Sequence, residues 1–170
     1  SPNGLRSGSS YVVFGKTSNF AATINLASLN GSNGFRLDGA LAGDYSGLSV
    51  SAAGDINGDG IDDLVVGAPG ADPNGANTGS GFVVFGKSSA FDANISLATL
   101  DGSAGIRLDG ALAGDATGTS VKAAGDINGD GIDDLVMGAP FADPNGIINA
   151  GSSYVLFGRD TGLLFKDGFE

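Results

Sequence analysis

The chain has 170 residues, of which 19 are acidic and 8 are basic, giving a formal net charge of −11. An acidic chain is a poor partner for nucleic acid or for an anionic membrane surface, so we expect neither. The absence of Cys and His excludes disulfides, thiolate zinc sites and cysteine nucleophiles, and removes the commonest general base. No apolar run approaches the roughly 18 residues that a membrane span requires, so no membrane insertion is expected.

The chain repeats itself at a shift of 71 or 72 residues. The run SSYVVFGK at residues 9–16 returns as SGFVVFGK at residues 80–87 and as SSYVLFGR at residues 152–159. Most of the 31 glycines recur at matching places in the units, which favours tight turns over disorder. Self-similarity at a fixed period is typical of a repeat architecture.

Each unit contains four short strand candidates, which we name A to D in chain order. The predicted ranges are 49–53 and 120–124 for A, 63–67 and 134–138 for B, the FVVFG-like runs for C, and 35–38 and 106–109 for D. Strands B and C are apolar on both alternating faces, which indicates that both faces are covered. Helix is nearly absent, with single turns expected at residues 25–29 and 96–100. The pattern predicts an all-β fold of four-stranded antiparallel propeller blades.

The most strongly specified stretch is GDINGDGIDDLVVGAP at residues 54–69, which returns at residues 125–140 with one substitution in sixteen positions. Acidic and amide side chains fall at relative positions 1, 3, 5 and 9 of the loop, and glycines permit its tight curl. Carboxylate, amide and carbonyl oxygens are the ligands that Ca²⁺ prefers. The ligands predicted for two Ca²⁺ per chain are Asp55, Asn57, Asp59, the carbonyl of Ile61 and Asp63, and in the second copy Asp126, Asn128, Asp130, the carbonyl of Ile132 and Asp134.

The loop differs from an EF-hand at position 12, where Val66 and Met137 replace the bidentate Glu. A short β-branched run follows the loop, so a strand and not a helix leaves it. The alternative is a turn-rich surface connection, as Asn-Gly and Asp-Gly often form. A repeated cluster of carboxylates that would repel one another without a cation favours the metal site.

The order of an FG-containing strand, a GD…GxSV strand, the DxNxDGxxD loop and a closing VGAP or MGAP resembles the FG-GAP repeat of integrin α-subunit β-propellers and their bacterial relatives. The resemblance covers essentially residues 1–168. It implies a propeller whose A–B loops bind Ca²⁺ through Asp55 to Asp63 and Asp126 to Asp134. The family closes a full ring of blades, whereas this chain holds strands for about two and a half.

We divide the chain into a partial blade with strands C and D at residues 1–46, a complete blade at 47–117, and a second blade with a shortened last strand at 118–170. The last strand is expected at residues 163–168, which resemble residues 34–39. Two and a half blades cannot close into a ring, and a two-stranded half-blade is only marginally stable alone in water. We therefore expect Val12, Phe14 and Phe35 to be buried against another copy.

Two other pairs of aspartates lie in or near the loops. Asp44 and Asp115, in the LAGD segment before strand A, could be additional ligands, but a turn cap is the favoured interpretation. Asp62 and Asp133, at position 8 of the loops, are expected to point away from the metal.

The favoured function is a non-catalytic, calcium-binding structural or adhesive module that assembles with other copies into a ring or filament. One alternative is an excised fragment of a larger secreted propeller that binds proteins or cell surfaces, and a less favoured one is a metal-dependent hydrolase. Because the chain begins at Ser1 without a signal peptide, we expect it to be processed or excised. An extracellular or cell-surface location and extracellular protein ligands are expected.

Overall fold

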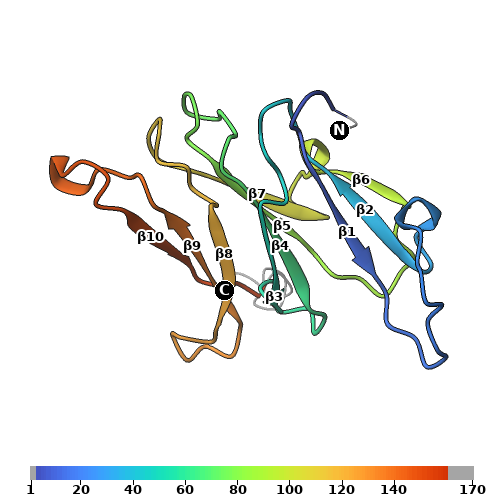
Figure 1. Ribbon diagram of the computed structural model, residues 1–170. Coiled ribbons are helices and arrows are strands. Elements are labelled where there is room, and N and C mark those ends of the chain that lie inside the picture. The colour runs from blue at the N-terminus through green and yellow to red at the C-terminus, as the bar shows by residue number, and fades with distance from the viewer. Residues whose placement is uncertain (1–2, 161–170) are drawn as a thin grey trace.

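A computed structural model describes residues 3–160, which form three β-sheets side by side (Figure 1). The sheet orders are β1-β2-β6, β3-β4-β5-β7 and β10-β9-β8. The strands are β1 (Ser9–Val13), β2 (Gly34–Asp38), β3 (Ser49–Gly54), β4 (Asp63–Ala68), β5 (Ser80–Val84), β6 (Asn94–Ser96), β7 (Gly105–Asp109), β8 (Ser120–Gly125), β9 (Asp134–Ala139) and β10 (Ser152–Leu156). The predicted all-β class is confirmed.

The second sheet is a complete blade in which each of four strands pairs antiparallel with the next. Its order matches the A, B, C, D sequence that the repeat predicts. Val65 pairs with Val83 and Val66 with Phe82, so apolar side chains cover both faces of the sheet. Blades that are apolar on both faces bury them by packing against neighbours on either side.

The third sheet repeats the first three strands of this blade. Strand β9 pairs with β8 on one edge and with β10 on the other, both antiparallel. The strand predicted at residues 163–168 lies outside the described residues. The third sheet therefore has strands A, B and C within the described part of the chain.

The first sheet contains an unexpected strand. β1 and β2 form the antiparallel C–D pair that the sequence predicts, and β6 then joins the outer edge of β2 in parallel. The Arg36 amide donates to the carbonyl of Ala93 at 2.9 Å. β6 belongs to the connection between strands C and D of the second blade, so it ties the two units together by main-chain hydrogen bonds.

Two apolar clusters lie between the sheets. The first joins β1 and β2 to the second sheet, and Phe35 is its aromatic centre. The Phe35 ring stacks on the Phe91 ring with 4.4 Å between centroids and meets the Phe14 ring edge-on with 5.7 Å between centroids. The second cluster joins β4 and β5 to Leu135 and Met137 of the third sheet. Sheets with interlocking side chains of this kind form one continuous body.

The first cluster corrects one expectation. Val12, Phe14 and Phe35 pack against the second sheet of the same chain, so their burial does not depend on another copy. The alternation of β1 instead turns Tyr11 and Val13 to the opposite face, where both are exposed. The sequence identified an apolar strand but not which neighbour its buried face would meet.

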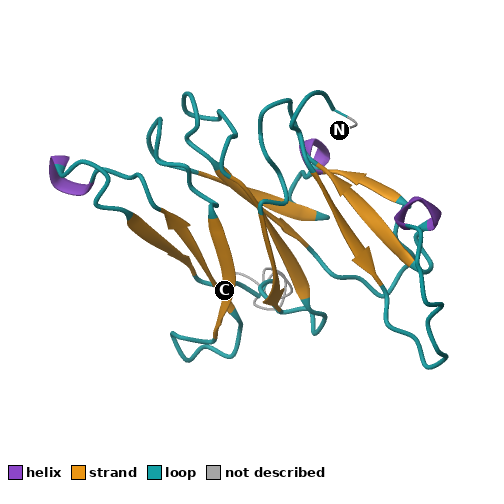
Figure 2. Ribbon diagram, in the orientation of Figure 1, coloured by secondary structure: helices purple, strands orange, loops and turns teal. Residues whose placement is uncertain are grey.

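Helix is limited to single 3₁₀ turns in the described residues (Figure 2). Two of them, Leu26–Ser28 and Leu97–Thr99, occupy the two predicted positions, and Pro144–Gly146 forms another. Asn25 begins the first turn, and its side chain accepts a hydrogen bond from the Ala27 amide. None of these described helical segments is long and apolar enough to cross a lipid bilayer.

The described strands thus form partial propeller blades, and the ring is open (Figure 1). The strand content of the three units follows the prediction apart from β6, and the last predicted strand lies outside the described part. The boundaries proposed after residues 46 and 117 remain predictions.

Phe91 and Phe20 occupy the same repeat position in different surroundings, which gives a matched test of the first cluster. Phe91 stacks on Phe35, whereas Phe20 is 50% exposed. We expect Phe91→Ala to lower the free energy of unfolding by about 2 kcal/mol, less than a fully buried Phe would. Phe20→Ala should change it by under about 0.5 kcal/mol. Urea unfolding measures both, and equal losses would contradict this packing.

Candidate metal centre

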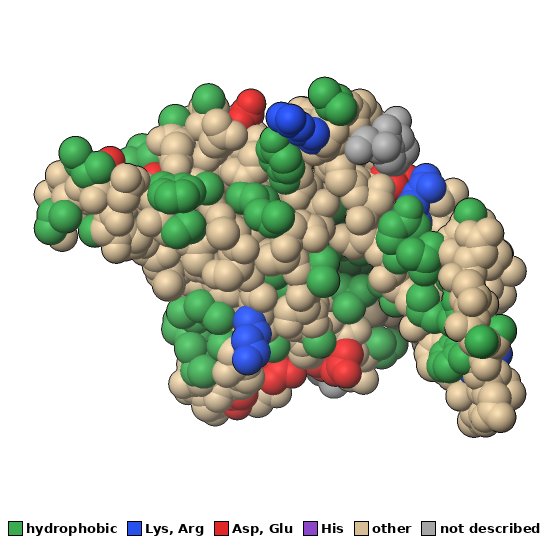
Figure 3. Space-filling model, viewed as in Figure 1, with side chains coloured by type: hydrophobic (Ala, Val, Ile, Leu, Met, Phe, Trp, Pro, Cys, Tyr) green, Lys and Arg blue, Asp and Glu red, His purple; other side chains and the backbone are tan. Residues whose placement is uncertain are grey.

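The two predicted metal loops connect strands A and B in the second and third sheets. One runs from β3 to β4 and the other from β8 to β9, and both lie at the same end of the molecule (Figures 1 and 2). Acidic side chains gather at this lower edge in the space-filling view (Figure 3). The structure therefore brings the two loops to one end of adjacent blades.

The first loop curls around its own backbone amides. The carboxylate of Asp55 accepts hydrogen bonds from the amides of Asp59 at 3.0 Å and Gly60 at 2.8 Å. The Asn57 side-chain oxygen accepts from the same Asp59 amide at 3.0 Å, and Asp59 Oδ1 accepts from Ile61 at 2.9 Å. Side chains at positions 1, 3 and 5 thus converge along one short loop.

Glycine is required for this curl. Gly58 has φ of 73° and Gly60 has φ of 85°, a region that L side chains rarely adopt. The corresponding Gly129 and Gly131 have φ of 79° and 89°. The NGDG sequence therefore sets the loop conformation locally, as predicted.

The second loop repeats the hydrogen bonds of the first. Asp126 accepts from the amides of Asp130 and Gly131 at 3.0 and 2.8 Å. Asn128 Oδ1 accepts from Asp130 at 2.9 Å, and Asp130 Oδ1 accepts from Ile132 at 2.9 Å. Identical sequences have folded into closely matching loops.

The aspartate at position 9 is buried and joins three segments. Asp63 accepts from the Ile56 amide at 3.0 Å and from the Gly86 amide at 2.8 Å. Asp134 accepts from Ile127 and Gly158 at 2.9 Å each. Each carboxylate thus fastens the start of its loop and the end of strand C to the first residue of strand B.

Burial raises the pKa of Asp63 from 3.8 to about 6. The amides of Gly86 and Ile56 oppose this shift because they favour the ionised carboxylate, while the nearby charges of Asp59 and Asp55 add to it. A buried carboxylate whose ionisation is disfavoured gains from a nearby cation. The electrostatics at Asp63 therefore suit a bound metal ion.

Gly86 and Gly158 are site residues that the ligand search in the sequence missed. A Cβ at Gly86 would collide with the carbonyl oxygen of Asp62, and a Cβ at Gly158 with that of Asp133. Only glycine lets the end of strand C approach the loop closely enough for its amide to reach the buried carboxylate. The signal was present in the sequence, since both glycines belong to the recurring FG pair.

The donor chemistry of the loops fits Ca²⁺. Each loop offers carboxylate, amide and main-chain carbonyl oxygens, the hard ligands that this ion takes, and neither loop offers nitrogen or sulfur side chains of His or Cys. Within residues 3–160, however, no three acidic side chains are gathered closely enough to form a ready-made metal site. The carboxylates instead bond to loop amides, so the ligand set remains a prediction.

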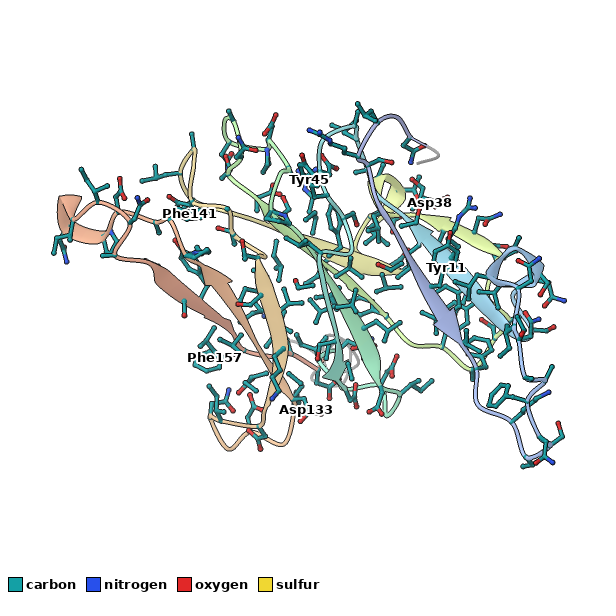
Figure 4. The ribbon with its side chains drawn as sticks, in the orientation of Figure 1. Tyr11, Asp38, Tyr45, Asp133, Phe141 and Phe157 are labelled. Atoms are coloured by element: carbon teal, nitrogen blue, oxygen red, sulfur yellow. The ribbon has the colours of Figure 1, made fainter. Side chains whose placement is uncertain are left out.

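The position 8 aspartates behave differently from one another. Asp62 is exposed, but Asp133 contacts the first loop, because its Oδ2 accepts from the Asp55 amide at 3.0 Å. Asp133 lies at the lower end of the molecule (Figure 4) and bonds to the neighbouring loop, so the prediction that it points away from the metal of its own loop is not contradicted. A loop in one blade touches the loop of the preceding blade, which a single repeat unit cannot reveal.

The LAGD aspartates cap turns. Asp44 Oδ2 accepts from the Leu41 amide at 2.8 Å and Asp115 Oδ2 from Leu112 at 3.2 Å. Burial raises the pKa of Asp44, an effect that the Leu41 amide opposes. Both residues precede strand A, whereas the metal loop follows it, so roughly 20 Å of strand separates them. The turn-cap interpretation holds.

Comparison with known proteins identifies the repeat. A family model described as the FG-GAP repeat matches residues 46–84 and 117–156. The chain is 34% identical over 147 residues to integrin alpha-PS2 of Drosophila melanogaster, covering 81% of this chain and 9% of that protein. It is 36% identical over 126 residues to integrin alpha-PS5 of the same organism, covering 74% and 11%.

A relative with another name also matches. Phosphatidylinositol-glycan-specific phospholipase D of Rattus norvegicus is 36% identical over 119 residues, covering 68% of this chain and 13% of that protein. The chain therefore spans only about a tenth of the length of the relatives it matches.

The raised pKa of Asp63 predicts a pH dependence of stability without calcium. Between pH 3.8 and about 6 the folded chain holds a proton on Asp63 that the unfolded chain has released. The contribution of Asp63 to the free energy of unfolding is therefore full below about pH 4 and is lost as pH rises through 6. Asp63→Asn should remove this part of the slope in chelator.

Urea unfolding at several pH values measures the effect. Asp62→Asn is the control, because its exposed side chain should leave the slope unchanged. Saturating Ca²⁺ should abolish the loss of stability at higher pH by favouring the ionised carboxylate. An Asp63→Asn protein with the original slope would contradict the assignment.

Proposed function

Because residues 46–84 and 117–156 are FG-GAP repeats, we propose that this chain is a non-catalytic, calcium-binding segment of an extracellular β-propeller that acts as a structural or adhesive module. The observation that carries the proposal is the duplicated oxygen-donor loop that precedes a buried carboxylate in two neighbouring blades. The likeness to integrin alpha subunits supports the adhesive and extracellular parts of the proposal.

Calcium is the proposed ligand of each loop. In the first loop Asp55, Asn57, Asp59, the carbonyl of Ile61 and Asp63 would hold it, and the equivalent residues of the second loop would hold another. The ion would offset acidic side chains that now rely on backbone amides, and it would relieve the disfavoured ionisation of Asp63. Its role would be to stabilise the junction of strands A and B.

The proposal includes no catalytic role, because the chain lacks the residue that most often serves as a general base. The chain has no His and no Cys, and hydrolysis would need a general base beside an open metal position. In each loop the spacing assigns all but one aspartate to the metal. Of the two that remain, Asp62 is exposed and Asp133 bonds to the first loop. The phospholipase D relative shares only this segment, 13% of its length, with the chain.

The partner surface is proposed at the first sheet. A groove of about 560 Å³ lies between β1 and the β3–β4 pair, and its lining residues include Val12, Leu37 and Val50. Hydrophobic side chains are visible in this hollow (Figure 3). Val50 is 59% exposed, whereas Val121, at the same repeat position, is 8% exposed under the preceding blade.

The uncovered edge of β1 and this groove are suited to receive β-strands. The strands would come from other copies of the chain, assembling into a ring or filament, or from a larger propeller of which the chain is a part. The short share of the relatives' length that the chain covers supports the larger propeller. The proposed partners are other copies, a larger propeller and extracellular protein ligands.

Calorimetry tests the calcium proposal. We expect two Ca²⁺ per chain, and one each for Asp59→Ala and Asp130→Ala. At a calcium concentration a hundred times Kd, loss of one site should remove about 2.7 kcal/mol of stability. The same variants should unfold like the parent in chelator, so a loss that is independent of calcium would contradict the metal role. Preferential binding of zinc would also contradict it.

Sedimentation over a range of concentrations tests the groove. We expect the chain to self-associate in calcium, because the apolar groove is uncovered, and Val50→Glu to weaken this by about tenfold in Kd. Ile148→Glu is the control, since Ile148 is 78% exposed and lies outside the groove. A monomer at all concentrations would contradict self-association and favour a larger propeller as the source of the missing strands.

A further inference from the structure

The two metal loops have the same sequence but different surroundings. Residues 54–65 and 125–136 are identical, GDINGDGIDDLV. Ile56 in the first loop is 4% exposed, whereas Ile127 at the same position of the second loop is 56% exposed. Asn57 is buried and Asn128 is exposed. Sequence cannot cause this difference, so it must come from what covers each loop.

The first loop is covered by the second. Asp133 makes two main-chain contacts with Asp55: its Oδ2 accepts from the Asp55 amide at 3.0 Å, and its own amide donates to the Asp55 carbonyl at 3.3 Å. The Arg159 amide, just after β10, donates to the carbonyl of Ile56 at 2.9 Å. A Cβ at Gly54 would collide with the Asp133 carboxylate, which shows how closely the two loops approach.

The contact is asymmetric along the chain. Asp62 occupies the position of Asp133 in the first loop, and its side chain is exposed. No described residue covers Asp126 or Ile127 in the way that Asp133 covers the first loop. Among residues 3–160, the first loop therefore receives a support that the second loop does not.

Asp133 is placed by the second loop itself. Its neighbour Asp134 is buried and held by the Ile127 and Gly158 amides, so the backbone at Asp133 depends on the ordering of residues that the second loop contributes. Asp134 is also the proposed position 9 ligand of that loop. An ion bound there would fix the peptide that carries Asp133.

We propose that Asp133 is a positioning residue that couples the two calcium loops, so that ordering of the second loop stabilises the first. The inference rests on the proposed calcium function. Since the first loop is held in shape before binding, it pays less conformational entropy and is the tighter of the two sites. Because coupling is reciprocal, calcium in either loop strengthens binding in the other.

The test uses the full chain and Ca²⁺ alone. Calorimetry should resolve two sites that differ by about tenfold or more in Kd, within the usual range of coupling. Asp133→Ala should weaken the tighter site by about tenfold, and Asp133→Asn, which keeps an acceptor oxygen, should restore most of the affinity. Asp62→Ala is the matched control at the same repeat position and should leave both sites unchanged.

Hydrogen exchange supplies a readout that needs no metal. In chelator, Asp133→Ala should speed exchange of amides in residues 55–57, while Asp62→Ala should not. Asp130→Ala, which disables the second loop, should also weaken calcium binding at the first. If the amides of residues 55–57 exchanged at the same rate in Asp133→Ala as in the parent, the proposed coupling through Asp133 would be overturned, even if the thermal stability of the variant were reduced.

The outcomes separate the two proposals. Absence of calcium binding in the parent chain would overturn the proposed function and the coupling with it. The coupling alone would be overturned, and the proposed function would stand, if two conditions held. The parent and Asp133→Ala would bind two calcium ions with the same affinities, and the remaining site of Asp130→Ala would keep its affinity.

Discussion

The lower end of each blade depends on a buried carboxylate that binds two backbone amides. Asp63 links the start of its loop, the start of β4 and Gly86, two residues after β5, and Asp134 does the same in the third sheet. A buried charge without partners would be costly, so these amides are needed for the carboxylate to stay there. The loop motif and the FG pair are thus two halves of one interaction.

Away from the loops, the three sheets are held together by face-to-face packing of their apolar side chains. The strands are apolar on both sides, and the two clusters fill the spaces between three adjacent sheets. β6 reinforces the first contact because it crosses from the second unit to the edge of β2. The same design leaves a groove beside the free edge of β1, which no described strand pairs, and this groove is where a partner is proposed to bind.

Neighbouring blades also make identical loops unequal. Ile56 and Ile127 share a sequence context, yet one is buried beneath the following blade and the other is open to solvent. A repeat protein whose units contact only their neighbours can therefore differentiate its sites without changing their residues. Asp133 provides such a contact, and it connects the proposed metal chemistry of one blade to that of the next.

The sequence by itself determined the repeat, the order of the strands, the single helical turns and the conformation of the NGDG loops, because turn glycines and alternating apolar residues act over a few positions. The tertiary structure alone decided that Phe35 faces the second sheet, that β6 pairs with β2 and that Asp133 reaches Asp55. These outcomes join residues about 56 to 78 positions apart, through packing and register between units. A pattern read within one repeat carries no information on which neighbour its faces and loop ends will meet.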